Sequence, residues 1–170
     1  MKIFGSLMLI FACTLFGLSY AKKLRERQNC LAEILQSLRF MEAELKNSAT
    51  PLPELFRELS ETSKHEAREF YAALSASMEN LGEESLANLW QNCVMESGRL
   101  TLSEMQKKEL CRPGLALGRY AGDEQLTAIQ SCIIHLEPEL QRAEEKARTG
   151  LRLYAGLGLT AGLMLATVLI

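Results

Sequence analysis

The chain has 170 residues, of which 24% are charged and 48% are hydrophobic, and its formal net charge is −2. This length accommodates one domain, and the near-balanced charge offers no basic stripe for phosphates, so we expect no nucleic-acid binding. Apart from Lys2, every charged residue lies between Lys22 and Arg152, so the two ends of the chain differ in kind from its middle.

The first predicted element is an uncharged segment over residues 3–21, followed by basic residues from Lys22 to Arg27. At about 1.5 Å per residue, a helix of this length crosses the ~30 Å apolar core of a bilayer. The alternative is a cleaved signal peptide, with Lys2 as its positive start and Ser19-Tyr20-Ala21 as its small-x-small cleavage site. The charges near the last segment of the chain bear on this choice.

A heptad pattern continues from this segment without Gly or Pro. Its apolar positions are Leu24, Leu31, Ile34, Leu38, Met41 and Leu45. Such a pattern is typical of the core-facing seam of a helix. The sequence therefore predicts one long helix that leaves the membrane and ends before the turn residues Asn47 to Pro51.

Four shorter amphipathic helices are predicted after this turn. The first begins at Pro53, a favoured first-turn residue, and the second and third cover residues 64–78 and 83–96. Their core-facing residues are Leu55, Phe56, Leu59, Ala67, Phe70, Tyr71, Leu74, Leu86, Leu89, Trp90, Cys93 and Val94. A capping box at Thr101-x-x-Glu104 opens the fourth helix, which is expected to end near Arg112-Pro113-Gly114.

A second heptad seam precedes the last apolar segment. Its positions are Leu126, Ile129, Ile133, Leu136, Leu140, Ala143 and Ala147. Asp123 is expected to cap this helix. Pro138 lacks a backbone donor and crowds the preceding turn, so it is expected to kink the helix or weaken a turn.

Residues 153–170 are uncharged and predict a second membrane span, with a buried core helix as the less favoured alternative. Basic residues mark the cytoplasmic side of a span, and they precede this one. They are Arg142, Lys146, Arg148 and Arg152. Both spans therefore place the middle of the chain in the cytoplasm, which a cleaved signal peptide would contradict. The sequence predicts spans over 3–21 and 153–170 and a cytoplasmic helical domain over 22–152.

The predicted fold class is all-α, because no alternating strand pattern or Asn-Gly hairpin turn is present. We expect a bundle of about six helices. Its two terminal helices start and finish at the same membrane face and extend into the spans as an antiparallel hairpin. In the second span, Gly158, Gly162 and Ala166 are spaced four apart and offer a flat face for close helix packing.

The chain lacks the residue patterns of an enzyme. It contains no P-loop, G-x-S-x-G or H-E-x-x-H motif, and neither His65 nor His135 has a Cys or His neighbour at metal-ligand spacing. The five cysteines are odd in number, and a reducing compartment makes them small apolar fillers. We therefore expect no catalysis, no cofactor and no metal.

Several short stretches, in this order and spacing, carry a family resemblance. They are Leu35-Gln36-Ser37-Leu38, Glu42-Ala43-Glu44-Leu45, Thr50-Pro51-Leu52, Trp90, Leu117-Gly118, Asp123-Glu124-Gln125 and Ala143-Glu144-Glu145-Lys146. Over its full length the chain resembles the stage III sporulation protein AB family of endospore-forming bacteria. Pro138 and Arg112-Pro113-Gly114 depart from the regular helices expected of that family.

The resemblance implies a structural role. Proteins of this family look like the cytoplasmic domain of the inner-membrane platform protein of type II secretion and type IV pilus machines. They belong to the channel complex that joins mother cell and forespore and supports late forespore gene expression. The implied partners are a secretion-type ATPase and other membrane subunits, with the central domain on the mother-cell side of the outer forespore membrane.

The predicted function is therefore a non-enzymatic membrane platform, and the alternative is a membrane-anchored coiled-coil signalling regulator. Partner-binding residues are expected at the hairpin tip, because loops on a rigid scaffold tend to carry recognition. The candidates are Thr50, Pro51, Leu52, Leu117, Gly118, Asp123, Glu124 and Gln125. Thr50-Pro51 could equally be a helix stop and start, and Leu117-Gly118 could be a C-cap.

Overall fold

The computed structural model describes residues 2–47, 50–96, 100–119 and 123–169, with the backbone alone at 2–14, 16–17 and 150–169. The chain divides into two compact units. The first combines Met1–Gln28 with Gln141–Ile170, and the second is Asn29–Leu140, called here the helical body.

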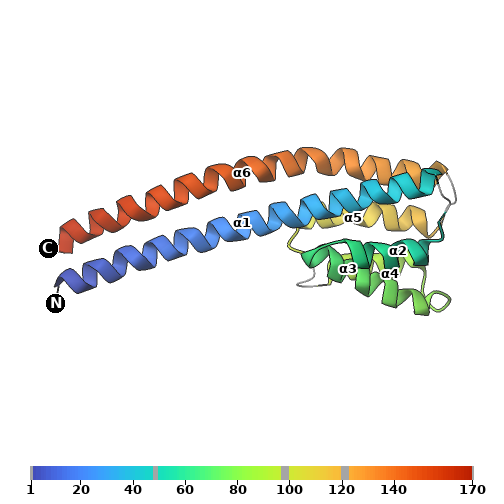
Figure 1. Ribbon diagram of the computed structural model, residues 1–170, viewed down its shortest axis with the longest axis horizontal. Helices are drawn as coiled ribbons and strands as arrows, with labels where there is room; N and C mark the ends of the chain where they lie inside the picture. The colour runs from blue at the N-terminus through green and yellow to red at the C-terminus, as the bar shows by residue number, and fades with distance from the viewer. Residues whose placement is uncertain (1, 48–49, 97–99, 120–122, 170) are drawn as a thin grey trace. The chain divides into compact units, whose positions relative to one another are not determined.

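The described residues form six α-helices, a short 3-10 turn and no strand. They are α1 (Lys2–Asn47), α2 (Leu52–Thr62), α3 (His65–Ser77), η1 (Met78–Asn80), α4 (Leu86–Met95), α5 (Glu104–Leu117) and α6 (Asp123–Leu169) (Figure 1). The all-α class and the number of helices are confirmed. Helix α6 runs through Pro138 without interruption.

The unit of Met1–Gln28 with Gln141–Ile170 contains the first part of α1 and the last part of α6. Ala21 and Ala147 are buried there, and Lys22 pairs with Glu26 one turn along α1. The predicted spans at 3–21 and 153–170, with Gly158, Gly162 and Ala166, fall almost entirely on residues whose side chains lie outside the described set. Within that set, no helix combines the length and apolar character needed to cross a bilayer.

In the helical body, α1 and α6 run antiparallel, as the two seams predict. Arg39 pairs with Glu137, and further along α1 the Gln130 amide donates to Glu42 Oε1 at 2.8 Å. Within the helical body, the central seam residues of the two helices have almost no exposed surface. They are Leu31, Ile34, Leu38 and Met41 in α1, and Ile129, Ile133 and Leu136 in α6.

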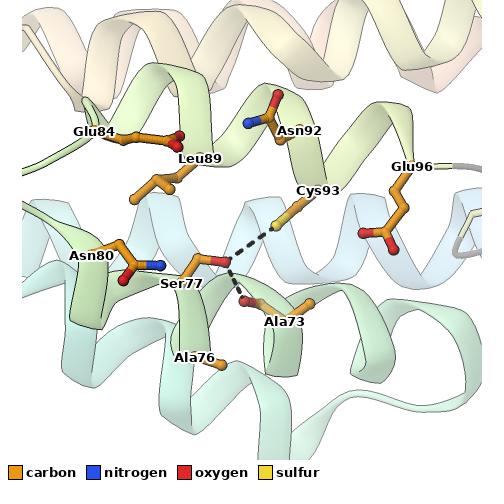
Figure 2. A pocket seen from close by; sticks show the side chains of 9 residues that line it. All are labelled: Ala73, Ala76, Ser77, Asn80, Glu84, Leu89, Asn92, Cys93 and Glu96. Carbon is orange, nitrogen blue, oxygen red and sulfur yellow. Dashed lines mark hydrogen bonds between the residues drawn. The ribbon is translucent and has the colours of Figure 1, made fainter.

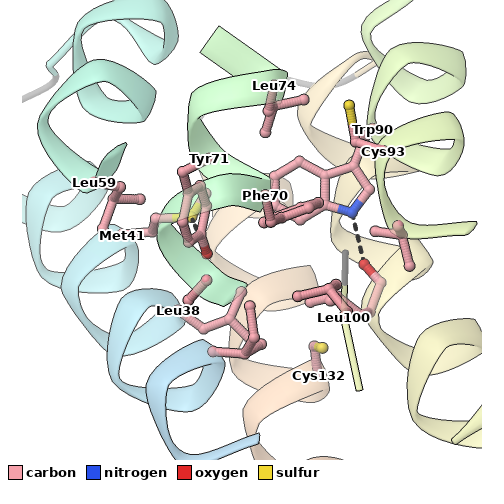
Figure 3. Packing of buried hydrophobic residues seen from close by; sticks show 14 of the residues in the cluster. Leu38, Met41, Leu59, Phe70, Tyr71, Leu74, Trp90, Cys93, Leu100 and Cys132 are labelled. Atoms are coloured by element: carbon pink, nitrogen blue, oxygen red, sulfur yellow. Dashed lines mark hydrogen bonds between the residues drawn. The ribbon is translucent and has the colours of Figure 1, made fainter. Parts of the chain in front are cut away.

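The core of the helical body is built around aromatic side chains from three of the short helices. Phe70 lies edge-on to Trp90, with ring centroids 5.4 Å apart, and to Tyr71, at 4.8 Å (Figure 3). Phe56 approaches Trp90 from α2 at 5.9 Å. These residues are fully buried, which confirms the apolar faces predicted for α2, α3 and α4. Because buried aromatic pairs contribute beyond their area, this cluster stabilises the packing of α2, α3 and α4 against one another.

Helix α5 does not end at Arg112-Pro113-Gly114, as predicted, but continues to Leu117. Pro113 has no N–H for the carbonyl of Glu109, one turn earlier, and Cys132 Sγ from α6 donates to that oxygen at 3.4 Å. Gly114 leaves room for Trp90, whose Nε1 donates to Leu110 O at 2.7 Å. The Pro-Gly pair thus marks a helix-packing site, and tertiary contacts override its usual meaning as a helix end.

The predicted capping box at Thr101 and Glu104 is wrong by two residues. Ser103 caps α5 by accepting from the N–H of Gln106, and the Gln106 side chain accepts from the N–H of Ser103. Thr101 instead binds Glu66 through its backbone N–H and its hydroxyl. The sequence Thr-Leu-Ser-Glu-Met-Gln contains both spacings, and the contact with Glu66 decides between them.

Candidate functional site

The predicted hairpin tip forms one end of the helical body. There the end of α1, the start of α2, the end of α5 and the start of α6 come together (Figure 1). The Gln125 amide donates to Leu117 O at 3.2 Å, joining the two sides of the α5–α6 connection. Thr50 Oγ1 donates to Glu44 Oε2 at 2.9 Å across the α1–α2 connection. Main-chain and side-chain contacts therefore hold the tip in place.

The candidate tip residues differ in what they present to solvent. Leu117 is buried in the core, and Leu52 is half-buried against it. Thr50 and Gln125 are half-buried and hydrogen-bonded within the body. The residues that remain exposed are Pro51, Gly118, Asp123 and Glu124. Leu117 therefore serves folding, whereas these four are available to a partner.

A cavity that the sequence did not predict adjoins Gly118. It lies between the start of α4 and the end of α5, has a volume of about 570 Å³, and is called here the α4–α5 cavity. Its lining is Ser85, Ala87, Arg112, Leu115, Ala116, Gly118 and Arg119. Leu115 is 57% exposed. The signal in the sequence that could have indicated this cavity was Leu115. It is an apolar residue directly after Gly114, and it lies off the face of α5 that packs against the core.

The described lining of the α4–α5 cavity includes two arginines and no carboxylate. Arg112 Nε lies 3.3 Å from Glu109 Oε2, and His135 Nδ1 lies 3.5 Å from the same oxygen. Glu109 is therefore shared between two neighbours. Arg119 makes no ion pair within the described part of the chain. Such a lining favours an anionic group with an apolar neighbour.

A second cavity, of about 470 Å³, lies between α3 and α4 and has the opposite charge (Figure 2). Glu84 and Asn80 lie at one end, Glu96 lies at the other, and Asn92 lies between them. On its floor Ser77 Oγ donates to Ala73 O at 2.7 Å. No group of three or more His, Cys, Asp or Glu among the described residues could hold a metal ion. This lining suits a cationic side chain.

Glu66 of α3 contacts both α1 and the segment that precedes α5. Its carboxylate accepts from the N–H of Thr101 at 2.9 Å and from the Thr101 hydroxyl, and it faces the Cys30 thiol of α1. Burial, followed by this neighbouring carboxylate, raises the pKa of Cys30 far above its usual range. Partial burial alone would raise the pKa of Glu66, but the hydrogen bonds from Cys30 and Thr101 outweigh it, so that pKa is lowered.

Replacing Glu66 by glutamine is expected to flatten the dependence of stability on pH. Because the pKa of Glu66 is lower in the folded protein, its carboxylate stabilises the fold above the ordinary value of 4.5, and this contribution is lost as pH falls through the folded pKa. The measurement is the urea midpoint by circular dichroism at several pH values. The urea midpoint of the wild type should be higher than that of Glu66→Gln at neutral pH, and the difference between the two midpoints should shrink in acid. A constant difference would contradict this assignment.

Comparisons with known proteins agree with this architecture. A family model described as Stage III sporulation protein AB matches residues 2–170. The stage III sporulation protein AB of Bacillus subtilis (strain 168) is 24% identical over 170 residues, which is 99% of each chain. A solved structure of stage III sporulation protein AB superposes with a TM-score of 0.65 at 22% identity. It covers 72% of this chain and 96% of that chain, a likeness of fold.

Proposed function

Because the chain belongs to the stage III sporulation protein AB family, we propose that it is a non-enzymatic membrane platform of the channel between mother cell and forespore. In this role α1 and α6 anchor the helical body in the outer forespore membrane, with the body on the mother-cell side. Its tip then docks a secretion-type ATPase and other subunits of the channel.

The anchoring part of the proposal is supported by two features of α1. The helix continues without a break through the uncharged segment 3–21 into the helical body. Near the end of this segment Leu15, Leu18 and Tyr20 are each almost half exposed. Lipid would cover these apolar surfaces, and the basic residues that follow them favour the cytoplasmic face. Protease accessibility of a tag inserted in the helical body tests this orientation. A tag exposed on the opposite side of the membrane would contradict it.

The docking part of the proposal rests on the tip, where four exposed candidate residues stand at the end of a packed bundle. A rigid support lowers the entropy cost of binding, so such residues are suited to recognition. Two of the tip residues, Asp123 and Glu124, belong to α6, the same helix that carries the second apolar segment. A partner bound at Asp123 and Glu124 would therefore be held to the membrane by one continuous helix.

The test is copurification of the ATPase with the tagged full-length protein from sporulating cells. Asp123→Arg combined with Glu124→Arg is expected to lower the recovered ATPase about tenfold or more. A partner surface that complements these two carboxylates is basic, so the introduced arginines would repel it. The matched control is Glu58→Arg with Glu61→Arg, two exposed positions on α2. Equal recovery with the tip variant and the control, at equal expression and helix content, would rule out docking at the tip.

A further inference from the structure

We propose that the α4–α5 cavity binds a segment of a protein partner in which a carboxylate lies next to an aliphatic side chain. The inference rests on the proposed docking function and specifies the chemistry of the partner. Arg112 and Arg119 would hold the carboxylate, and Leu115 with Ala116 would cover the aliphatic side chain.

The charges that line the cavity favour an acidic occupant. Among the described residues, its only charged side chains are Arg112 and Arg119. Helix α4 contributes no charged residue at all, and Glu84, which precedes its cap, lines the other cavity. Arg119 has no described ion-pair partner of its own. A guanidinium presents a planar fork of donors that matches a carboxylate, so two of them at one cavity give a defined site for an acidic side chain.

The apolar part of the lining favours a protein segment over a small anion. Leu115 is more than half exposed although it belongs to a helix whose other leucines are buried. A free phosphate or sulfate would meet the arginines and leave this side chain in water. An aliphatic residue next to the partner's carboxylate would cover Leu115 and gain the free energy of apolar burial.

The helices that form the cavity are fixed against each other. A Cβ added at Gly118 would lie 3.0 Å from the backbone N of Ala87, so the end of α5 and the start of α4 are in close contact. One turn further in, Trp90 Nε1 donates to Leu110 O. Ser85 caps α4 by accepting from the N–H of Asn88. The cavity is therefore preorganised, which reduces the entropy cost of binding.

The test uses the full-length protein in detergent micelles and a fluorescein-labelled, alanine-based helical peptide with a central Leu-Glu-Glu-Leu. The comparison peptide has Leu-Gln-Gln-Leu. Fluorescence anisotropy gives both dissociation constants. We expect the glutamate peptide to bind about tenfold more tightly, since charge-assisted hydrogen bonds replace neutral ones.

Three variants separate the parts of the site. Arg119→Glu is expected to weaken binding of the glutamate peptide about tenfold or more. Leu115→Gln removes the apolar contact and should weaken both peptides. Ala87→Phe fills the cavity while keeping both arginines, so it should weaken binding without changing the net charge. The matched control, Arg68→Glu on the exposed side of α3, makes the same charge change outside the cavity and should leave binding unchanged.

The inference is overturned by equal binding of the two peptides, by an effect of Arg68→Glu as large as that of Arg119→Glu, or by unchanged binding in Ala87→Phe. Absence of binding up to about 1 mM, an affinity of only ~4 kcal/mol, overturns it as well. Copurification of the ATPase with the wild-type protein separates the two proposals. If the peptide fails to bind wild type while the ATPase is recovered, only this inference fails. If the peptide binds and wild type recovers no ATPase, only the docking function fails.

Discussion

Replacing Gly114 by alanine is expected to destabilise the protein by about 3 kcal/mol, although the same change stabilises an ordinary helix by about 1 kcal/mol. The sign reverses because the new Cβ would lie 2.4 Å from Cγ of Trp90. The ring cannot move away, since Trp90 is fully buried and its Nε1 is bonded to Leu110 O. The measurement is the free energy of unfolding in urea, followed by far-ultraviolet circular dichroism.

A double-mutant cycle tests this cause. Trp90→Ala removes Cγ and Cδ1 of the indole, the two atoms nearest to the added Cβ, together with one hydrogen bond. If the clash explains the effect, Gly114→Ala should cost clearly less in the Trp90→Ala background than in wild type, because neighbouring substitutions are not additive. An equal cost in both backgrounds would mean that the backbone of α5, and not the indole, sets the requirement for glycine.

Replacing Phe70 by alanine is expected to cost about 4 kcal/mol. The side chain has no exposed surface and makes edge-on contacts with both Trp90 and Tyr71. Its removal leaves a cavity at the centre of the core, where the surrounding helices can relax only in part. Urea unfolding gives this loss directly, and a destabilisation below about 1 kcal/mol would contradict the central position assigned to the ring.

Phe40 provides the matched control for this prediction. It is also a phenylalanine on a helix, but it is only partly buried against the same core. Phe40→Ala removes the same atoms with less loss of buried surface, so its cost should be about half that of Phe70→Ala. Comparable losses at the two positions would mean that the amount of buried surface does not set the cost, and would contradict this prediction.

The fold could be predicted wherever periodicity alone decides the structure. The seam of α1 was identified from Leu31, Ile34, Leu38 and Met41, because an amphipathic helix in a bundle must bury one face. The faces of α2, α3 and α4 followed from the same rule. Predicted helix ends were less accurate. α5 continues past Pro113 because Cys132, distant in sequence, donates to the Glu109 carbonyl that Pro113 leaves without a backbone donor.

The candidate site could be predicted only in its location. A hairpin implied a tip, and the candidates at the connections do meet at one end of the helical body. Which of them face solvent depended on packing that periodicity does not report. Leu117 turned inward, whereas Arg119 and Leu115, which were not predicted, line a cavity. A cavity arises from the relative placement of two helices, here α4 and α5, and a single helical pattern carries no information on it.

Trp90 is the only tryptophan in the chain, and its indole N–H is fixed to a carbonyl of the helix that carries Arg112 and Leu115. The intrinsic tryptophan emission of this protein therefore originates from a single buried position in contact with α5, a helix that lines the α4–α5 cavity. A ligand that displaced α5 would change the wavelength of that emission without any added label. The protein thus contains its own optical reporter of the cavity.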